Sequence, residues 1–237
     1  MFTSEKFVNE DFLKKHGISL LCGSELPQRL RGVQCLFVQG NVELLKEDEY
    51  FFLAIVGSRD PQGDCESLIR KTVEVFAACT NLVVVSGLAR GIDSAAHSIA
   101  LELGVPTISV LGYGILHAYS TRKEYRQLRE RIPQSGGLVV SQYEPYEPPG
   151  RSNFLTRNEL IVRFSDLIFP VQGKVPSGTY STVVKAVKMR KPIFCLRNRW
   201  VKDIIRYLRF IRYNYARVLA PEELDLDAVQ ELVTTKN

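Results

Sequence analysis

The chain has 237 residues, 45% of them hydrophobic and 24% charged, which allows one large core, or one core and a small appendage, and excludes disordered and fibrous proteins. The formal net charge of +5 permits an anionic partner without requiring one. No apolar run reaches the roughly 18 residues of a membrane span, and the N-terminus lacks the cationic-then-apolar order of a secretory signal. We therefore expect a soluble, cytoplasmic protein with no membrane partner.

The cysteines give no sign of cross-linking or metal binding. They are odd in number and widely scattered, and no two have the two-residue spacing of a zinc ribbon or redox motif: Cys22, Cys35, Cys65, Cys79 and Cys195. The sequence predicts neither disulfides nor a structural metal, and we expect no cofactor.

Residues 1–50 have some helical character but are too few for a large core of their own, so we expect an N-terminal extension packed on the main domain. In residues 51–196, short β-branched apolar runs alternate with segments of helical period. This alternation is typical of a doubly wound α/β domain with a mostly parallel sheet.

Six apolar runs predict strands, and most are continuously apolar, as in strands buried on both faces: 51–57, 82–86, 107–111, 138–141, 167–171 and 192–196. The segments between them predict helices at 64–79, 92–103, 123–131, 157–164 and 179–189. Ligands of such a sheet gather outside the carboxyl ends of its strands, and the conspicuous loops of this sequence all follow strands.

The turn after the first predicted strand favours a phosphate. Gly57 permits close approach of the backbone, and Ser58 and Arg59 place a hydroxyl and a guanidinium beside the start of the next helix. The helix terminus adds positive potential, and Arg59 is a bidentate donor. The alternative is that this turn only caps the helix.

The loop after the second predicted strand can approach a ligand through its main chain. It consists of Ser86, Gly87, Leu88, Ala89, Arg90 and Gly91. It lacks the Gly-Lys-Ser/Thr ending of a Walker loop, and it lacks the Gly-x-Gly-x-x-Gly pattern of a dinucleotide-binding loop. Asp93 and His97 follow, four residues apart on one helical face. They could form an acid–imidazole pair, but we favour a helix cap at Asp93 and a local hydrogen bond at His97.

Residues 149–159 combine cations, amides and an aromatic ring before a predicted helix. Phe154 could stack on a base, with charge from Arg151 and Arg157 and an amide from Asn158, as on a single-strand platform. Alternatively, Phe154 anchors the core and Arg157 forms an ion pair at the sheet edge. The sequence leaves both interpretations open.

The last crossover helix opens on Ser177, Gly178 and Thr179. Hydroxyls and free N–H groups at a helix start can bind an anion.

Residues 197–237 form a basic, aromatic segment followed by an acidic tail. Seven Lys or Arg and a single acid, Asp203, lie in 197–217, interleaved with Trp200, Tyr207, Phe210, Tyr213 and Tyr215. If 202–215 is a helix, its apolar face can dock while the cationic face binds phosphates. The alternative is a solvated helix that covers the sheet edge.

Together, these loops resemble the DNA-processing protein A family, DprA or Smf. The resemblance covers roughly residues 27–196 and is carried by 54–59, 85–93 with Ala96 and His97, Phe154 with Arg157 and Asn158, and Ser177 with Gly178. It implies an extended Rossmann-like domain that binds single-stranded DNA, protects incoming strands in natural transformation and loads the RecA recombinase without catalytic turnover. It also implies a homodimer.

The predicted nucleic-acid-binding residues are Ser58, Arg59, Ser86, Gly87, Leu88, Ala89, Arg151, Phe154, Arg157, Asn158, Ser177, Gly178 and Thr179. The sequence departs from the family pattern in three places. Glu159 stands where the family has a second Arg, Tyr119-Ser120 replaces Tyr-Pro, and residues 196–199 replace Pro-Gly. The winged-helix domain of many members is also missing, which implies a shortened, divergent member.

Two alternative functions follow from the same fold class. One is a nucleotide-binding sensor or a nucleotide-processing enzyme, whose hydrolase forms carry a catalytic acid after a glycine-rich loop. Residues 175–182 contain no carboxylate, which disfavours hydrolysis. The other is an adaptor that has lost DNA affinity, for which Glu159 is the best sequence argument.

Overall fold

Continuous apolar runs form the centre of the sheet, and every residue in them is buried. They are β3 (Phe51–Val56), β4 (Leu82–Ser86), β5 (Thr107–Leu111), β6 (Leu138–Ser141), β7 (Leu167–Pro170) and β8 (Ile193–Leu196). Neighbours among these six pair in parallel. The computed structural model describes residues 9–46, 49–117 and 123–234. It confirms the six predicted strands and the predicted doubly wound α/β fold class.

Three further strands extend the sheet, so that the described residues form nine strands in the order β1-β2-β6-β5-β4-β3-β7-β8-β9. β1 (Ile18–Cys22) and β2 (Cys35–Gly40) form an antiparallel pair beside β6. β9 (Ala216–Leu219) pairs in parallel with β8 at the other edge. The sequence did not predict the edge strands β1 and β9, because they are only partly buried and their apolar runs are short. It also missed β2, although residues 35–38 are continuously apolar.

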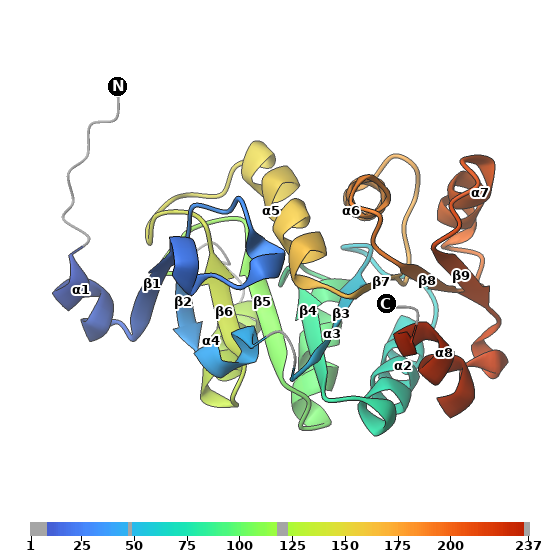
Figure 1. Cartoon of the computed structure of the whole chain (residues 1–237), viewed down its shortest axis with the longest axis horizontal. Coiled ribbons are helices and arrows are strands. Elements are labelled where there is room, and N and C mark those ends of the chain that lie inside the picture. Colours follow the sequence, from blue (N-terminus) through green and yellow to red (C-terminus); the bar gives the residue numbers. More distant parts are fainter. Residues whose placement is uncertain (1–8, 47–48, 118–122, 235–237) are drawn as a thin grey trace.

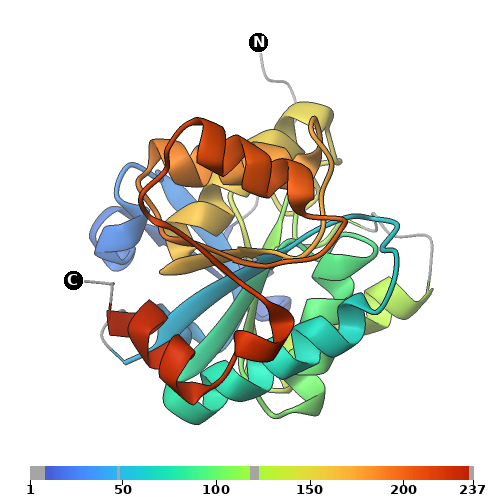
Figure 2. The ribbon, with the colours of Figure 1, turned by 90° about the vertical axis from the view of Figure 1, so that its right-hand side faces the viewer.

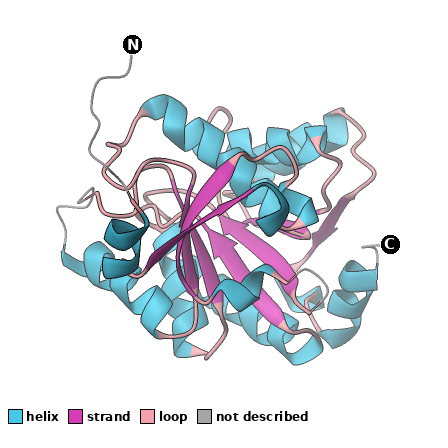
Figure 3. Cartoon of the chain, turned by 60° about the vertical axis from the view of Figure 1, so that its left-hand side comes forward, coloured by secondary structure: helices cyan, strands magenta, loops and turns pink. Residues whose placement is uncertain are grey.

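Helices cover both faces of the sheet (Figures 1 and 3). One face carries α5 (Arg151–Phe164), α6 (Gly178–Lys188) and α7 (Lys202–Phe210). The other carries α2 (Cys65–Cys79), α3 (Ile92–Glu102), α4 (Lys123–Gln134) and α8 (Leu226–Thr234). The short α1 (Glu10–Lys15) precedes β1. Figure 2 shows α6 and α7 above the sheet, with α2 and α8 below it.

Two predicted helices differ by five or six residues from their bounds in the structure. α5 begins at Arg151 rather than at residue 157. Its first turns were not predicted as helix because they consist mainly of polar residues. α7 ends at Phe210 rather than at residue 215, since Arg212 adopts a positive φ of 51° and the chain then enters β9. The predicted two-faced character of α7 is confirmed: Ile204, Ile205 and Leu208 are buried, and Arg206 and Arg209 are exposed.

The structure contains one disulfide, between Cys22 and Cys35, so the expectation of no disulfides is wrong for this pair. The two residues face each other across the antiparallel ladder of β1 and β2, and their Cα atoms lie 4.3 Å apart. This neighbourhood could not be seen in the sequence, because the two strands were not predicted. Cys65, Cys79 and Cys195 are free thiols.

Candidate nucleic-acid interface

The loops singled out in the sequence converge on one edge of the sheet. The chain builds outward from β3 in both directions, through β4, β5 and β6 on one side and β7 and β8 on the other. The switch point therefore lies between β3 and β7, where an open α/β sheet forms its ligand-binding crevice. Residues 57–64 and 171–177 follow these two strands, and residues 87–91 follow the neighbouring β4.

An aromatic ring between two guanidinium groups forms the centre of this edge. The Cζ atoms of Arg59 and Arg157 lie 5.4 Å and 5.9 Å from the centroid of the Phe154 ring. The ring packs on Gly112, where an added Cβ would lie 2.7 Å from Phe154 Cδ1. Arg59 is exposed and Phe154 is half-buried. Gly112 is one of the two glycines in the loop after β5, and nothing in the sequence marks it as the support of this ring.

Arg157 lies beneath this surface rather than on it. Its side chain is buried and forms an ion pair with Asp93, with 3.7 Å between Nη1 and Oδ2. An added Cβ on Gly87 would lie 1.1 Å from Arg157 Nη1, so the guanidinium fills the space under the loop after β4. Among the described residues, its Nε and Nη1 atoms have no hydrogen-bond acceptor.

The Asp93 carboxylate holds the backbones of two loops against this buried pair. It accepts hydrogen bonds from the backbone N–H groups of Gly57, Ala89 and Gly87. Burial raises the pKa of Asp93, and Arg157 opposes that shift. Burial also lowers the pKa of Arg157, while Asp93 opposes that shift. The pair therefore connects α3, α5 and the loops after β3 and β4 at the centre of the site.

His97 makes a separate contact and does not act as the partner of Asp93. Its Nδ1 lies 2.7 Å from Thr107 Oγ1, which in turn donates to the Val84 carbonyl. Burial and the neighbouring Arg157 lower the pKa of His97 to about 3, so the imidazole is neutral at physiological pH. The expected local hydrogen bond at His97 is confirmed. The expected helix cap at Asp93 is wrong, because Gly91 is the N-cap residue of α3 and no side chain among the described residues caps this helix.

The loops after β3 and β4 are locked together by their backbones. The Ile92 amide donates to the Ser58 carbonyl at 3.1 Å. Gly91 has a φ of +88°, and a Cβ there would lie 2.3 Å from the same oxygen, so this approach requires glycine. The Arg90 Nε atom donates to the Arg59 carbonyl. The Ser58 hydroxyl is used within its own turn, where it contacts the backbone of Asp60.

Four further predicted residues in these loops have structural contacts. The buried Ser86 hydroxyl donates to the Ile55 carbonyl at 2.6 Å. Leu88 is buried with a positive φ of 54°, and the Ala89 carbonyl accepts from Ser94. The buried Thr179 hydroxyl donates to the Gln172 carbonyl. These side chains shape the loops, so a ligand at this edge meets the backbone more than the hydroxyls.

The start of α6 lies next to α5. Asn158 Nδ2 donates to the Gly178 carbonyl at 3.4 Å, and Ser177 Oγ accepts from the Tyr180 amide as the helix cap. Gly178 is exposed, and a Cβ there would meet no atom within 4 Å. The structure thus brings the start of α6 to the same edge as α5, although Ser177 is occupied as a cap.

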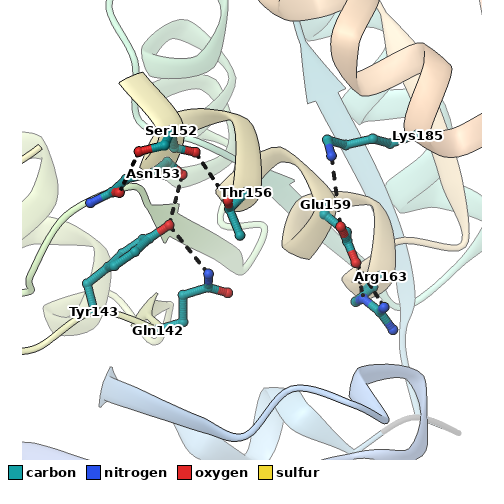
Figure 4. A network of polar contacts seen from close by, with 8 residues as sticks. All are labelled: Gln142, Tyr143, Ser152, Asn153, Thr156, Glu159, Arg163 and Lys185. Atoms are coloured by element: carbon teal, nitrogen blue, oxygen red, sulfur yellow. Dashed lines mark hydrogen bonds and ion pairs between the residues drawn. The ribbon is translucent and has the colours of Figure 1, made fainter. Parts of the chain in front are cut away.

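The first turns of α5 are fixed by a polar network (Figure 4). Tyr143 Oη donates to the Asn153 carbonyl at 3.0 Å, and Thr156 Oγ1 donates to the Ser152 carbonyl at 3.1 Å. These contacts hold the helix turn that carries the Phe154 ring. Arg151 is exposed at the first residue of the helix, and no acidic side chain among the described residues pairs with it.

Two cationic side chains on the same face of the sheet balance the charge of Glu159. Arg163 donates to its Oε1 through Nε at 3.1 Å and Nη2 at 2.9 Å, and Lys185 Nζ lies 3.8 Å from Oε2. Figure 4 shows this pairing further along α5 than Ser152 and Thr156. The carboxylate is therefore balanced locally.

Metal ligands, membrane-spanning helices and one departure from the family pattern remain to be placed. Within residues 9–46, 49–117 and 123–234, no group of three His, Cys, Asp or Glu side chains could hold a metal ion. No helix in the same ranges is both long and apolar enough to cross a membrane. The departure at Tyr119 and Ser120 lies outside the described residues.

The strand order and this edge define a doubly wound α/β protein with a cationic, aromatic surface at its switch point. A model of the family described as DNA recombination-mediator protein A matches residues 23–218. The chain therefore belongs to the DNA recombination-mediator protein A family, and the predicted resemblance to DprA and Smf proteins is confirmed.

Two relatives show the extent of the similarity. The DNA processing protein DprA of Streptococcus pneumoniae is 37% identical over 163 residues, which are 68% of this chain and 54% of that protein. Protein Smf of Escherichia coli is 34% identical over 161 residues, which are 68% of this chain and 41% of that protein. The chain thus spans about half the length of the curated relatives it matches.

Solved structures agree with the fold. DprA from Streptococcus pneumoniae matches with a TM-score of 0.75 and 26% identity, over 94% of this chain and 78% of that one. DNA processing protein A from Helicobacter pylori, which has a single-stranded DNA binding mode, matches with a TM-score of 0.75 and 25% identity, over 92% of this chain and 96% of that one. A molybdenum cofactor carrier protein of Chlamydomonas reinhardtii, at 16% identity and TM-score 0.54, shares the fold alone.

Proposed function

We propose that the edge formed by the carboxyl ends of β3, β4, β5 and β7 binds single-stranded DNA. The observation that carries this proposal is the half-buried Phe154 ring, which lies close to the exposed Arg59 guanidinium and to the buried Arg157 guanidinium. An aromatic ring next to cations suits single strands, because unpaired bases stack on the ring while phosphates bind the cations.

The predicted residues take two kinds of role in this proposal. Arg59 and Arg151 bind phosphates, Phe154 stacks on a base, and the backbone at Leu88 and the start of α6 supplies N–H groups. Gly87 and Ala89 donate their N–H groups to Asp93 and so hold the loop in place. Residues whose side chains are buried or occupied as caps position these groups: Ser58, Ser86, Arg157, Asn158, Ser177 and Thr179.

The family membership supports a finer proposal for the biological role. The protein covers single strands in the cytoplasm and passes them to a RecA-type recombinase, acting by binding alone and without bond chemistry. The Helicobacter pylori relative binds single-stranded DNA, which supports the same ligand class here. The homodimer implied by the resemblance is part of this proposal, and sedimentation at several protein concentrations tests it.

Titration of a labelled oligonucleotide, single-stranded and double-stranded, at low and moderate salt tests the proposed ligand. The wild-type protein should prefer the single strand, and Arg59→Ala/Arg151→Ala should abolish that preference. The matched control is Arg126→Ala/Arg131→Ala, which removes two exposed arginines from α4 on the opposite face and should leave binding unchanged.

Other outcomes favour the alternatives. A mononucleotide that stays bound through purification, with no oligonucleotide binding, would favour a nucleotide sensor or enzyme. Binding of neither ligand would favour an adaptor. Glu159 gives that alternative less support than its position in the sequence suggested, because Arg163 and Lys185 balance its charge.

A further inference from the structure

A second arginine–aromatic pair lies on the edge of the sheet that carries Phe154. The segment between β8 and α7 contains Arg199 and Trp200, and the Arg199 Cζ atom lies 4.5 Å from the centroid of the Trp200 ring. β8 is separated from β3 only by β7. These three strands are parallel, so their carboxyl ends meet at one edge.

This segment is fixed to its neighbours by backbone contacts. Asn198 Oδ1 accepts from the amides of Trp200 at 2.9 Å and Val201 at 3.1 Å, and Asn198 Nδ2 donates to the Val171 carbonyl at 3.3 Å. The Gly173 amide donates to the Trp200 carbonyl at 3.1 Å. The pair is therefore held against the loop after β7.

The Trp200 ring also reaches the loop that carries Arg59. Gly63 has a φ of +71°, and a Cβ added there would lie 1.9 Å from Trp200 Cη2. Gly63 is four positions after Arg59 in the chain, so their Cα atoms are at most about 14 Å apart. The two arginine–aromatic pairs are thus close enough for one short single strand to reach both.

The exposed charges near Trp200 favour the binding of a polyanion. Arg197, Arg199 and Lys174 are exposed, and none of them pairs with an acidic side chain in the part of the chain that the structure describes. The acids of the adjoining loop are engaged elsewhere. Asp60 pairs with Arg90, and the carboxylate of Asp64 caps α2.

We propose that Arg197, Arg199 and Trp200 form a second subsite for single-stranded nucleic acid, in which a base stacks on the Arg199–Trp200 pair and the guanidinium groups bind phosphates. The strand runs from Phe154 across the ends of β3 and β7 to Trp200. This inference rests on the proposed function. It concerns a stretch, residues 196–199, in which the sequence departs from the family pattern.

Trp200 is the only tryptophan in the chain, so its fluorescence reports on this subsite alone. Oligothymidylates of about 4 and about 15 nucleotides bracket the site sizes of single-strand binders. The longer oligonucleotide should quench Trp200 emission. Arg197→Gln/Arg199→Gln should weaken its binding about tenfold and reduce the slope of log K against log salt by about 1.4, or about 0.7 for each lost phosphate contact. Binding of the shorter oligonucleotide should change less than about twofold, and Arg126→Gln/Arg131→Gln on α4 should match the wild type.

The failures of the two proposals are distinguishable. If the labelled long oligonucleotide binds while Trp200 emission stays constant and Arg197→Gln/Arg199→Gln binds like the α4 control, the second subsite is wrong and the proposed function stands. If the wild-type protein binds no oligonucleotide, both proposals are wrong.

Discussion

At the scale of single residues, Gly87 is required because the Arg157 guanidinium fills the space where a side chain would begin. An added Cβ would lie 1.1 Å from Arg157 Nη1. Gly87→Ala should therefore displace Arg157 from Asp93 and lower the free energy of unfolding by about 1 to 3 kcal/mol. Urea denaturation measures this loss.

Gly178→Ala is the matched control for that substitution. No atom lies within 4 Å of its added Cβ, so its stability should stay within about 0.5 kcal/mol of the wild type. Equal stability of the two alanine variants would contradict the packing of Arg157 under the Gly87 loop.

The low pKa of the buried His97 should reduce the free energy of unfolding in mild acid. Its pKa is about 3 in the folded protein and about 6.5 in the unfolded chain. Between these values the unfolded chain binds a proton that the folded protein does not, so stability falls as the pH falls below 6.5. The loss from pH 7 to pH 5 should be about 2 kcal/mol.

Urea denaturation of His97→Gln at the two pH values isolates this contribution. The difference between pH 7 and pH 5 should shrink by about 2 kcal/mol. An unchanged pH dependence in His97→Gln would show that His97 is not held neutral in the folded protein.

The sequence could predict which loops meet, but not which of their side chains reach the surface. Arg59 and Phe154 lie together as the single-strand interpretation required. Arg157 matched both interpretations in the sequence, and only the structure shows it buried beside Asp93. The local sequence around an arginine does not determine whether its side chain faces solvent or fills the space between a glycine loop and a buried carboxylate.

At the scale of elements, prediction succeeded where burial is complete. The six central strands are buried along their whole length and appear as unbroken apolar runs. β1 and β9 are partly exposed, and a polar residue interrupts each of them, so neither shows the unbroken apolar run of a central strand. The first turns of α5 were missed for a similar reason, since they carry the polar residues that anchor the Phe154 ring.

Reduction of the disulfide between β1 and β2 should measurably destabilise the protein. The disulfide closes a sequence separation of 13 residues, for which chain entropy gives a stabilisation of about 3 kcal/mol. Reductant should lower the urea midpoint of the wild-type protein and leave Cys22→Ser/Cys35→Ser unchanged.

Thiol titration of the unfolded, unreduced protein provides the independent check on that ladder. The three free cysteines, Cys65, Cys79 and Cys195, should react. Five reactive thiols per chain would contradict the cross-strand disulfide.

At the scale of the whole molecule, the fold concentrates chemistry at one edge of the sheet. Parallel strands send every connection after β3, β4, β5 and β7 to the same side, so loops far apart in the chain become neighbours. The buried Asp93–Arg157 pair joins two of these loops to α5. The opposite ends of the strands carry no comparable set among the motifs of the sequence.

Photo-crosslinking of a single-stranded oligonucleotide that contains 5-iododeoxyuridine tests the location of the bound strand most directly. Trypsin cleaves after Arg151 and Arg157 and releases residues 152–157, which contain Phe154. We expect the crosslinked base on this peptide, and its loss in Arg59→Ala, which keeps both cleavage sites. Adducts assigned only to residues 72–79, 96–102 or 127–134, the carboxyl-terminal halves of α2, α3 and α4, would contradict binding at the carboxyl edge of the sheet.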